Sequence, residues 1–349
     1  MHPVLFEAFG YPVHLYAVMI ATGFIAGVWL AARYGERVGY DRDLIYDLMW
    51  WLLVSGLVGS RIVFIMVNWE QYYYPCVDVA HFNSLFPDNA IEEADCTRLL
   101  RFWNGGLVFY GGVIMAMLTM VWFMRREKLP FLPIADVIIP SLAVGQFFGR
   151  LGCLSAGCCW GRPTDASWAI EFPRRTLVFR QHLEEGLVDA AATHSHSIHP
   201  TQLYDALCGL ILFGILIWIR QRKRFHGQVF VWWMLIYPLM RSTVELFRGD
   251  DAERGFIIRV VSEPLNDLLG LPEGSAAFLS TSQFISIGMM VTAVIILYVN
   301  RTPSMEGVMG PSPLAPTSGR FDGSDAPSAD EVEASPAVEV SDDLSENDS

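Results

Sequence analysis

Long apolar segments recur along this chain, and the residues between them carry most of its charge. Each segment holds about 17–21 residues, the length that an α-helix needs to cross the hydrocarbon core of a bilayer. The seven segments are residues 13–32, 47–67, 106–124, 131–149, 203–219, 229–247 and 283–299. Because helices satisfy their own backbone hydrogen bonds in lipid, the pattern predicts an all-α integral membrane protein with seven transmembrane helices.

The composition agrees with this pattern, since 52% of the 349 residues are hydrophobic and only 17% are charged. Such a chain is too apolar for an ordinary soluble domain. The first apolar segment has no basic stretch before it and no convincing small-residue cleavage site after it. We therefore expect it to remain as a span and not to be removed as a signal peptide.

Basic residues predict the orientation of the spans. They cluster after the first, third and fifth segments, at residues 33–42, 125–128 and 220–224. Because such loops stay in the cytoplasm, the N-terminus is expected outside and the C-terminus in the cytoplasm. The remaining long loops then face outward and form a small extracytoplasmic head; they are residues 68–105, 150–202 and 248–282.

The acidity of the chain is concentrated in its last residues. The formal net charge is −13, and residues 302–349 hold eleven acidic residues and one arginine, a local charge of −10, which leaves −3 for residues 1–301. This segment is rich in proline, serine and alanine and contains a single aromatic residue, Phe321. We expect a membrane domain over 1–301 followed by a disordered cytoplasmic tail, and the acidity argues against nucleic-acid binding.

Charged residues interrupt the outer parts of several predicted spans. Arg61 lies in the second span, Arg150 closes the fourth, and Arg241 and Glu245 lie in the sixth, just before Arg248. A charge inside the membrane costs roughly 2.5–3.5 kcal/mol on insertion scales, so each needs a partner or a function. Arg241 and Glu245 share a helix face and are expected to pair. Arg61 by itself could also extend to the interface.

Four arginines and one carboxylate at one depth leave positive charge unbalanced. A structural ion pair accounts for Arg241 and Glu245 but not for the whole group. Arginine binds phosphate through two parallel hydrogen bonds, and the phosphate available at that depth belongs to a lipid headgroup. The sequence therefore predicts an anion-binding site at the outer leaflet.

Glycine-rich and polar motifs are expected at the same face of the membrane. NGGLVFYGG (104–112) opens the third span, GRLGCLSAGCCWGRP (149–163) follows the fourth, and HPTQLYDA (199–206) enters the fifth. Glycines let a ligand approach the backbone closely, although tight helix packing would explain them as well. The last motif adds His199 and Gln202 to the predicted polar surface.

These motifs, taken together and in order, resemble those of the prolipoprotein diacylglyceryl transferase family over nearly all of residues 10–300. The matching segments are VHLYAVMI, VGSRIVF followed by NW, WNGGLVFYGG, GRLG with GCCWGRPT, HPTQLYDA, YPLMRSTVELFRGD and LSTSQFISI. The resemblance implies an enzyme of the bacterial cytoplasmic (inner) membrane that acts at the outer leaflet. It implies transfer of the diacylglyceryl group of phosphatidylglycerol to the lipobox cysteine of a prolipoprotein signal peptide, the first step of lipoprotein maturation. It implies no metal and no cofactor.

The resemblance also assigns roles to residues of this chain. Arg150 and Arg241 match essential arginines, of which Arg150 binds the lipid phosphate, and Glu245 matches the acid that accompanies Arg241. The other matches are pocket and signature positions expected to bind substrate: Tyr16, Tyr237, Gly161, Arg61, His199, Gln202 and Arg248.

This chain departs from the family pattern at three signature positions. Tyr110 stands where the pattern has histidine, Cys153 where it has asparagine, and Cys158 where it has an acid. A histidine base is therefore absent at position 110. We expect Tyr110 to donate a proton or hydrogen bond to the leaving oxygen, because a tyrosine acts as a base only with a strongly lowered pKa.

The remaining cysteines leave several interpretations open. Cys76 and Cys96 lie in one outward loop and either form a disulfide or stay as thiols, since sequence does not show proximity. The three cysteines of the signature loop are Cys153, Cys158 and Cys159. They could bind a metal together with His194, His196 or His199, form a disulfide, or pack around the glycines, which is the interpretation that the sequence favours.

Two other functions would use the same arginines. A transporter or channel for an anionic solute would place them as selectivity charges, but the inner halves of the spans show few ionisable residues to continue a polar path. A lipid-binding paralogue without enzymatic activity is the other alternative, motivated by the three substitutions. Bound phospholipid together with group transfer would distinguish the enzyme from both.

Overall fold

The computed structural model describes residues 4–8, 11–101, 106–174, 176–249, 256–261, 264 and 276–299. The predicted tail over 302–349 and most of the predicted outward loop 248–282 lie outside the described residues. In the part that is described, a long helix forms over each of the seven predicted apolar segments. These helices are α1 (Leu15–Arg37), α2 (Arg42–Val67), α5 (Phe109–Arg126), α6 (Phe131–Ala156), α8 (Thr201–Gln221), α9 (Gln228–Glu245) and α11 (Thr281–Val299).

Five of the helices, namely α1, α2, α6, α8 and α11, are long and apolar enough to cross a membrane. The shorter α5 ends in Arg125 and Arg126, and α9 contains Arg241 and Glu245. These charges lower the mean hydropathy of two helices that the apolar pattern also predicts as spans. The prediction of a helical membrane protein is confirmed.

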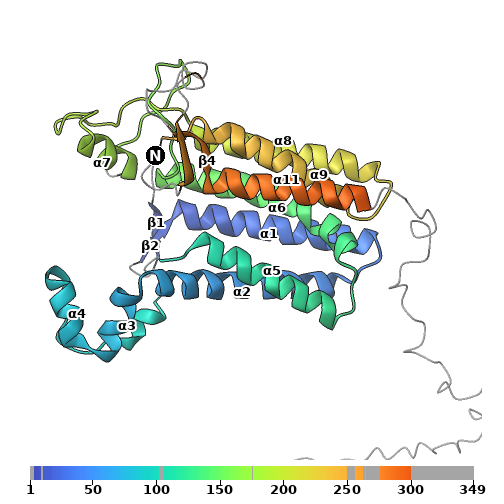
Figure 1. Ribbon diagram of the computed structural model, residues 1–349, viewed down its shortest axis with the longest axis horizontal. Helices are drawn as coiled ribbons and strands as arrows, with labels where there is room; N and C mark the ends of the chain where they lie inside the picture. The colour runs from blue at the N-terminus through green and yellow to red at the C-terminus, as the bar shows by residue number, and fades with distance from the viewer. Residues whose placement is uncertain are drawn as a thin grey trace, which may run out of the picture. The chain divides into compact units, whose positions relative to one another are not determined.

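The helices pack as a series in which α6 has a central place. It contacts α1 on one side and α8 and α9 on the other, while α2 packs on α5 and α9 packs on α11 (Figure 1). The burial of α6 agrees with its central place, since all residues from Ile134 to Ser141 are buried. A residue that projects from α6 is therefore held by neighbours on several sides.

Helices α2 and α5 approach each other through glycines. A Cβ atom on Gly59 would lie 2.6 Å from the carbonyl oxygen of Gly111, and one on Gly111 would lie 2.5 Å from that of Gly59. Neither distance leaves room for a side chain, so small residues allow the two backbones to meet. This contact fixes the N-terminal end of α5, where Tyr110 lies.

Short strands accompany the helices. Strands β1 (Val4–Ala8) and β2 (Tyr11–His14) form one antiparallel pair, and β3 (Phe256–Val261) and β4 (Ala276–Ser280) form another. Strand β2 runs directly into α1, and β4 runs directly into α11. The apolar pattern predicts none of these strands, because each contains only four to six residues.

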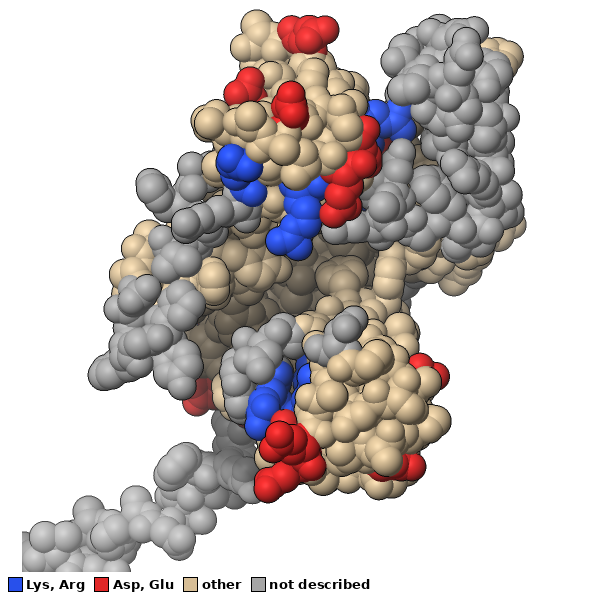
Figure 2. Space-filling view, turned by 90° about the vertical axis from the view of Figure 1, so that its left-hand side faces the viewer, with Lys and Arg blue, Asp and Glu red and all other residues tan. Residues whose placement is uncertain are grey.

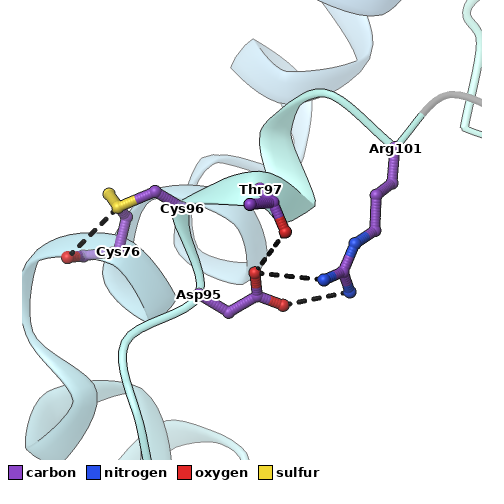
Figure 3. The surroundings of a disulfide bond; sticks show 5 residues. All are labelled: Cys76, Asp95, Cys96, Thr97 and Arg101. Carbon is purple, nitrogen blue, oxygen red and sulfur yellow. Dashed lines mark hydrogen bonds and ion pairs between the residues drawn. A yellow bond between two sulfur atoms is a disulfide. The ribbon is translucent and has the colours of Figure 1, made fainter.

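The first predicted outward loop folds into short helices that a disulfide joins. The bond links Cys76 near the end of α3 (Trp69–Val77) to Cys96 at the start of η2 (Cys96–Leu99), across α4 (Val79–Leu85) and η1 (Pro87–Asn89). Beside it, Asp95 pairs with Arg101 at 3.1 Å and accepts a hydrogen bond from Thr97 (Figure 3). The disulfide interpretation of these two cysteines is therefore correct.

The second predicted outward loop has a small hydrophobic core of its own. Trp160, Phe172, Val178 and Ile198 are buried together, and Val178 belongs to α7 (Leu177–Glu184). Figure 1 shows α3, α4 and α7 at the same end of the helical bundle. Seen from that end, the surface is hollowed between two lobes, and Lys or Arg side chains lie along both edges of the hollow (Figure 2).

The opposite end of the bundle contains a buried carboxylate, Asp136 of α6. It accepts hydrogen bonds from the backbone of Gly227 at 2.8 Å and Phe230 at 3.0 Å, at the start of α9. Lys223 lies 3.6 Å from it. Backbone N–H groups at a helix N-terminus need acceptors, so Asp136 connects α6 to α9.

Candidate functional site

Arg150, in the last turns of α6, forms an ion pair with Asp205 of α8. Its Nη1 lies 3.3 Å from Oδ2 of Asp205, and the aspartate side chain is 2% exposed. The second carboxylate oxygen, Oδ1, is buried and has no hydrogen-bond partner among the described residues. The carboxylate therefore fixes one edge of the Arg150 guanidinium, whose side chain stays 21% exposed and accessible.

Arg241 and Glu245 form the ion pair that their spacing predicts. Nη2 of Arg241 lies 2.6 Å from Oε2 of Glu245, and both side chains are nearly buried. The other terminal nitrogen of Arg241, Nη1, is buried without a hydrogen-bond partner within the described part of the chain. An unused guanidinium donor in a buried position is suited to an anionic ligand.

Three tyrosines lie around these arginines. Tyr237 of α9 interacts electrostatically with Arg241, Arg150, Asp205 and Tyr110, which places side chains from four helices in one region. Tyr16 of α1 interacts in the same way with Arg150. A Cβ atom on Gly152 would lie 3.1 Å from the Tyr16 ring, so Tyr16 packs directly on α6. The structure thus brings predicted site residues together from four helices, α1, α5, α6 and α9, and adds Asp205 of α8.

Gly161, His199 and Arg248 meet where the signature loop crosses the start of α8. Gly161 and Arg248 form an antiparallel bridge, and a Cβ atom on Gly161 would lie 2.6 Å from Cβ of His199. The imidazole Nδ1 of His199 lies 3.1 Å from the hydroxyl of Tyr204, and burial lowers the pKa of this histidine below its usual value. The glycine is required here by the close approach of another backbone segment.

Gln202 and Thr201 bind the signature loop from the first turn of α8. Nε2 of Gln202 donates to the carbonyl of Cys158 at 2.8 Å, and Oγ1 of Thr201 donates to that of Cys159 at 2.9 Å. Gln202 is fully buried. Its described contacts are with the loop, so it positions the residues that follow Arg150.

Arg61 of α2 contacts the first outward loop. Its guanidinium donates to the carbonyls of Arg98 at 2.7 Å, Leu99 at 3.0 Å and Gly106 at 3.1 Å. It also lies over the ring of Tyr72. These contacts connect α2 to the segment that carries the disulfide, whereas a role in lipid binding stays a prediction.

Cys153, Cys158 and Cys159 form a compact cluster beside Arg150. Their sulfur atoms all lie within 4.8 Å of one another, and they are free thiols. Hydrogen bonds from the Cys153 and Cys158 thiols lower the pKa of Cys159, and the charges of Arg248 and Arg150 act in the same direction. The histidines considered as partners in the sequence do not belong to this cluster.

Asp205 is the site residue that the sequence analysis does not single out. It lies in the HPTQLYDA motif, one turn inside the fifth predicted span, where any carboxylate is costly without a partner. Its pairing with Arg150 corrects the expectation of a single carboxylate among the arginines. Two carboxylates, Asp205 and Glu245, thus pair with Arg150 and Arg241, respectively.

The arrangement can bind a compact anion and stabilise negative charge that develops on it. Two guanidiniums from α6 and α9 are oriented by separate carboxylates, so they need little reorganisation when an anion arrives. The tyrosine hydroxyls can donate further hydrogen bonds. This chemistry suits a phosphate ester whose leaving oxygen gains charge.

Comparison with known proteins agrees with the resemblance. Residues 3–299 match the model of a family described as prolipoprotein diacylglyceryl transferase. The chain is 28% identical to a phosphatidylglycerol–prolipoprotein diacylglyceryl transferase of Clostridium tetani over 301 residues, which cover 86% of this chain and 98% of that protein. It is 31% identical to the protein of the same name from Sodalis glossinidius over 277 residues, which cover 77% and 88%.

Proposed function

The chain belongs to the prolipoprotein diacylglyceryl transferase family, and from this premise we propose how its residues carry out the reaction. Its activity is the transfer of a diacylglyceryl group from phosphatidylglycerol to a prolipoprotein. We propose that the acceptor is the thiol of the lipobox cysteine in the signal peptide. The sulfur attacks the glycerol carbon that bears the phosphate, the C–O bond breaks, and its electron pair leaves on the oxygen of glycerol phosphate.

Arg150 and Arg241 bind the phosphate in this proposal. The observation that carries it is the pair of guanidiniums, each held by its own buried carboxylate, with Nη1 of Arg241 left unpartnered among the described residues. Charge grows on the phosphate oxygens as the C–O bond breaks, so these cations stabilise the transition state more than the bound lipid. Asp205 and Glu245 keep the two arginines in orientation.

Tyr110 donates a hydrogen bond or proton to the leaving oxygen. Its electrostatic interaction with Tyr237, which also interacts with both arginines, supports this position. Tyr16 and Tyr237 line the lipid site, and Arg248 adds positive charge at its edge. Gly161, His199 and Gln202 hold the loop after Arg150 in place, and Arg61 connects the site to the first outward loop.

The site faces the outer leaflet of the bacterial cytoplasmic membrane in this proposal. Seven helices span the bilayer over residues 1–301, the N-terminus lies outside, and the acidic segment 302–349 is cytoplasmic. The basic loops support this orientation, and so does the disulfide between Cys76 and Cys96, because structural disulfides persist in oxidising compartments. Labelling of introduced cysteines with a membrane-impermeant reagent tests it.

The proposed role of Arg150 can be tested with purified protein, phosphatidylglycerol and a synthetic lipobox peptide. Mass spectrometry of the peptide detects the added diacylglyceryl group. We expect product with the wild type, no product with Arg150→Ala, and normal product with Arg180→Ala, which removes an exposed arginine of α7. Product formation by Arg150→Ala at the wild-type rate would contradict the assigned role.

The transporter alternative has no specific support from the described residues. Asp136, the buried carboxylate near the opposite end, is engaged by the start of α9 and by Lys223. Flux of an anionic solute through liposomes that contain the protein, without group transfer, would favour that alternative.

A further inference from the structure

The three cysteines beside Arg150 have the arrangement of ligands for a single metal ion. Their sulfurs lie within 4.8 Å of one another, and all three residues are half-buried. A tetrahedral zinc ion with Zn–S bonds of about 2.3 Å separates its sulfur ligands by about 3.8 Å. Small side-chain rotations are therefore enough to bring the three sulfurs to one ion.

The backbone that carries the cluster is fixed before any ion binds. Gly157 ends α6 in the left-handed conformation, and the chain turns back so that the N–H of Cys158 donates to the carbonyl of Cys153 at 3.2 Å. Cys159 also has a positive φ of 57°. Such a conformation is costly for a residue with a side chain and persists only where its surroundings impose it.

Contacts from α8 impose this conformation. Gln202 and Thr201 bind the carbonyls of Cys158 and Cys159 and so hold this part of the loop backbone, while the Cys158 thiol donates to the carbonyl of Cys153 at 3.8 Å. A ligand set that is held in advance loses little conformational entropy when the metal binds.

The number and type of ligands indicate the kind of site. Three thiolates select soft or borderline metals such as zinc, and structural zinc sites take four protein ligands, whereas catalytic sites take three and keep one position open. The described cluster contains three cysteines and no fourth protein ligand. A divalent ion with three thiolates carries one net negative charge, which Arg150 and Arg248 can balance.

We infer that Cys153, Cys158 and Cys159 bind one thiophilic metal ion of the zinc class, and that its open position binds the acceptor thiol as a thiolate. The second part rests on the proposed function. Both carboxylates of the site are already engaged by arginines, and a tyrosine hydroxyl is a weak base. A thiol that coordinates zinc loses its proton, so the metal supplies the nucleophile without a protein base.

The step balances in atoms and charge. The acceptor thiol releases its proton to water on coordination and becomes a thiolate. Its sulfur then forms the bond to the glycerol carbon, and the electron pair of the broken C–O bond leaves with glycerol phosphate, beside Arg150. The thioether product is a weaker ligand than a thiolate, and it leaves the metal.

Metal content tests the first part. The full-length protein is dialysed against zinc chloride, washed and analysed for bound zinc, and the same is done for Cys153→Ser, Cys158→Ser and Cys208→Ser. We expect about one zinc per chain in the wild type and in Cys208→Ser, which changes a cysteine outside the cluster, and none in the other two. Equal zinc in all four proteins, or a disulfide among the three cysteines in freshly isolated membranes, would overturn the site.

Cobalt substitution tests the second part without relying on variants that fail to fold. Cobalt(II) bound to thiolates has a characteristic absorption spectrum, and we expect this spectrum to change when a lipobox peptide is added but not when the same peptide carries serine in place of cysteine. We also expect chelation to reduce transfer by wild-type protein on the order of 100-fold, with recovery when zinc is restored.

The outcomes separate the two proposals. Transfer that is equally fast in metal-free protein would refute the metal inference and leave the transferase intact. A peptide-dependent cobalt spectrum without any diacylglyceryl product would support the metal site and contradict the proposed reaction.

Discussion

Arg150 on α6 and Asp205 on α8 are joined by a buried ion pair, with 3.3 Å between Nη1 and Oδ2. The pair connects two helices that pack closely along the bundle, so the orientation of the guanidinium depends on α8 as much as on α6. Because Asp205 is 2% exposed, removal of its charge leaves Arg150 without its described partner in a poorly hydrated place.

We therefore expect Asp205→Asn to reduce diacylglyceryl transfer by about 10- to 100-fold, as loss of an orienting partner does in other sites. The amide keeps the shape of the side chain but does not fix the arginine electrostatically. Rates at several phosphatidylglycerol concentrations, compared with Glu184→Gln on the exposed face of α7, provide the measurement. An unchanged rate would mean that Arg150 is oriented by other contacts.

Glu245→Gln should destabilise the protein by about 3–5 kcal/mol, because it leaves the Arg241 charge buried beside a neutral group. The double variant Arg241→Gln/Glu245→Gln should regain much of this stability but no activity, since removal of both charges costs less than removal of one. Thermal unfolding in detergent micelles measures stability, and peptide lipidation measures activity. If the double variant is no more stable than Glu245→Gln, the loss of stability in the single variant does not come from the unpaired charge of Arg241.

Tyr110→Phe should lower turnover by about 100-fold, the contribution typical of a positioned proton donor. Affinity for phosphatidylglycerol should change little, because the hydroxyl acts when the C–O bond breaks. Phe109→Leu, at the neighbouring exposed position, is the control for packing. Wild-type turnover in Tyr110→Phe would remove the tyrosine from the mechanism.

Removal of the disulfide should loosen the first outward loop. The bond joins residues 20 positions apart, and a loop of that size is stabilised by about 3 kcal/mol in the chain-entropy model. We expect faster proteolysis between residues 68 and 101 in Cys76→Ser/Cys96→Ser than in the wild type, whereas cleavage within 160–200 should not change. Equal cleavage rates would show that Arg61 and its carbonyl contacts suffice to hold the loop.

Acidification should weaken the packing of α7. His182 is 2% exposed, and burial lowers its pKa below the usual 6.5, so the folded protein holds it neutral. The unfolded segment binds a proton more readily, hence the stability is complete above about pH 6.5 and is lost as the pH falls through the folded pKa. The hydrogen-exchange protection of residues 177–184, corrected for the intrinsic exchange rate at each pH, should decrease as the pH falls below about 6.5, and His182→Phe should remove this pH dependence.

The sequence predicts the helices of this protein well, because an apolar segment of bilayer length has few alternatives to a helix in lipid. It also predicts the contact between Arg241 and Glu245, since residues four apart share a helix face. The partner of Arg150 has no such spacing rule. Asp205 lies on a different helix, and its pairing depends on how α6 packs against α8.

The cluster of three cysteines illustrates the same limit. Cys153 is the one cysteine of α6, and the other two follow the left-handed Gly157, so their convergence depends on how that turn reverses the chain. The spacing of cysteines in the sequence does not correspond to a standard zinc motif, so the sequence by itself favours packing. The carbonyl contacts from Gln202 and Thr201, which direct the loop, come from a segment beyond position 200.

The contact between Gly59 and Gly111 has a consequence for mutational tolerance. Neither residue has a side chain that could take part in chemistry, yet any larger residue at either position must separate α2 from α5. Tyr110 directly precedes Gly111, so that separation displaces the tyrosine hydroxyl from Tyr237 and from the arginines. A survey of variant activities would therefore find these two glycines as intolerant of substitution as the reacting groups, although their contribution is purely steric.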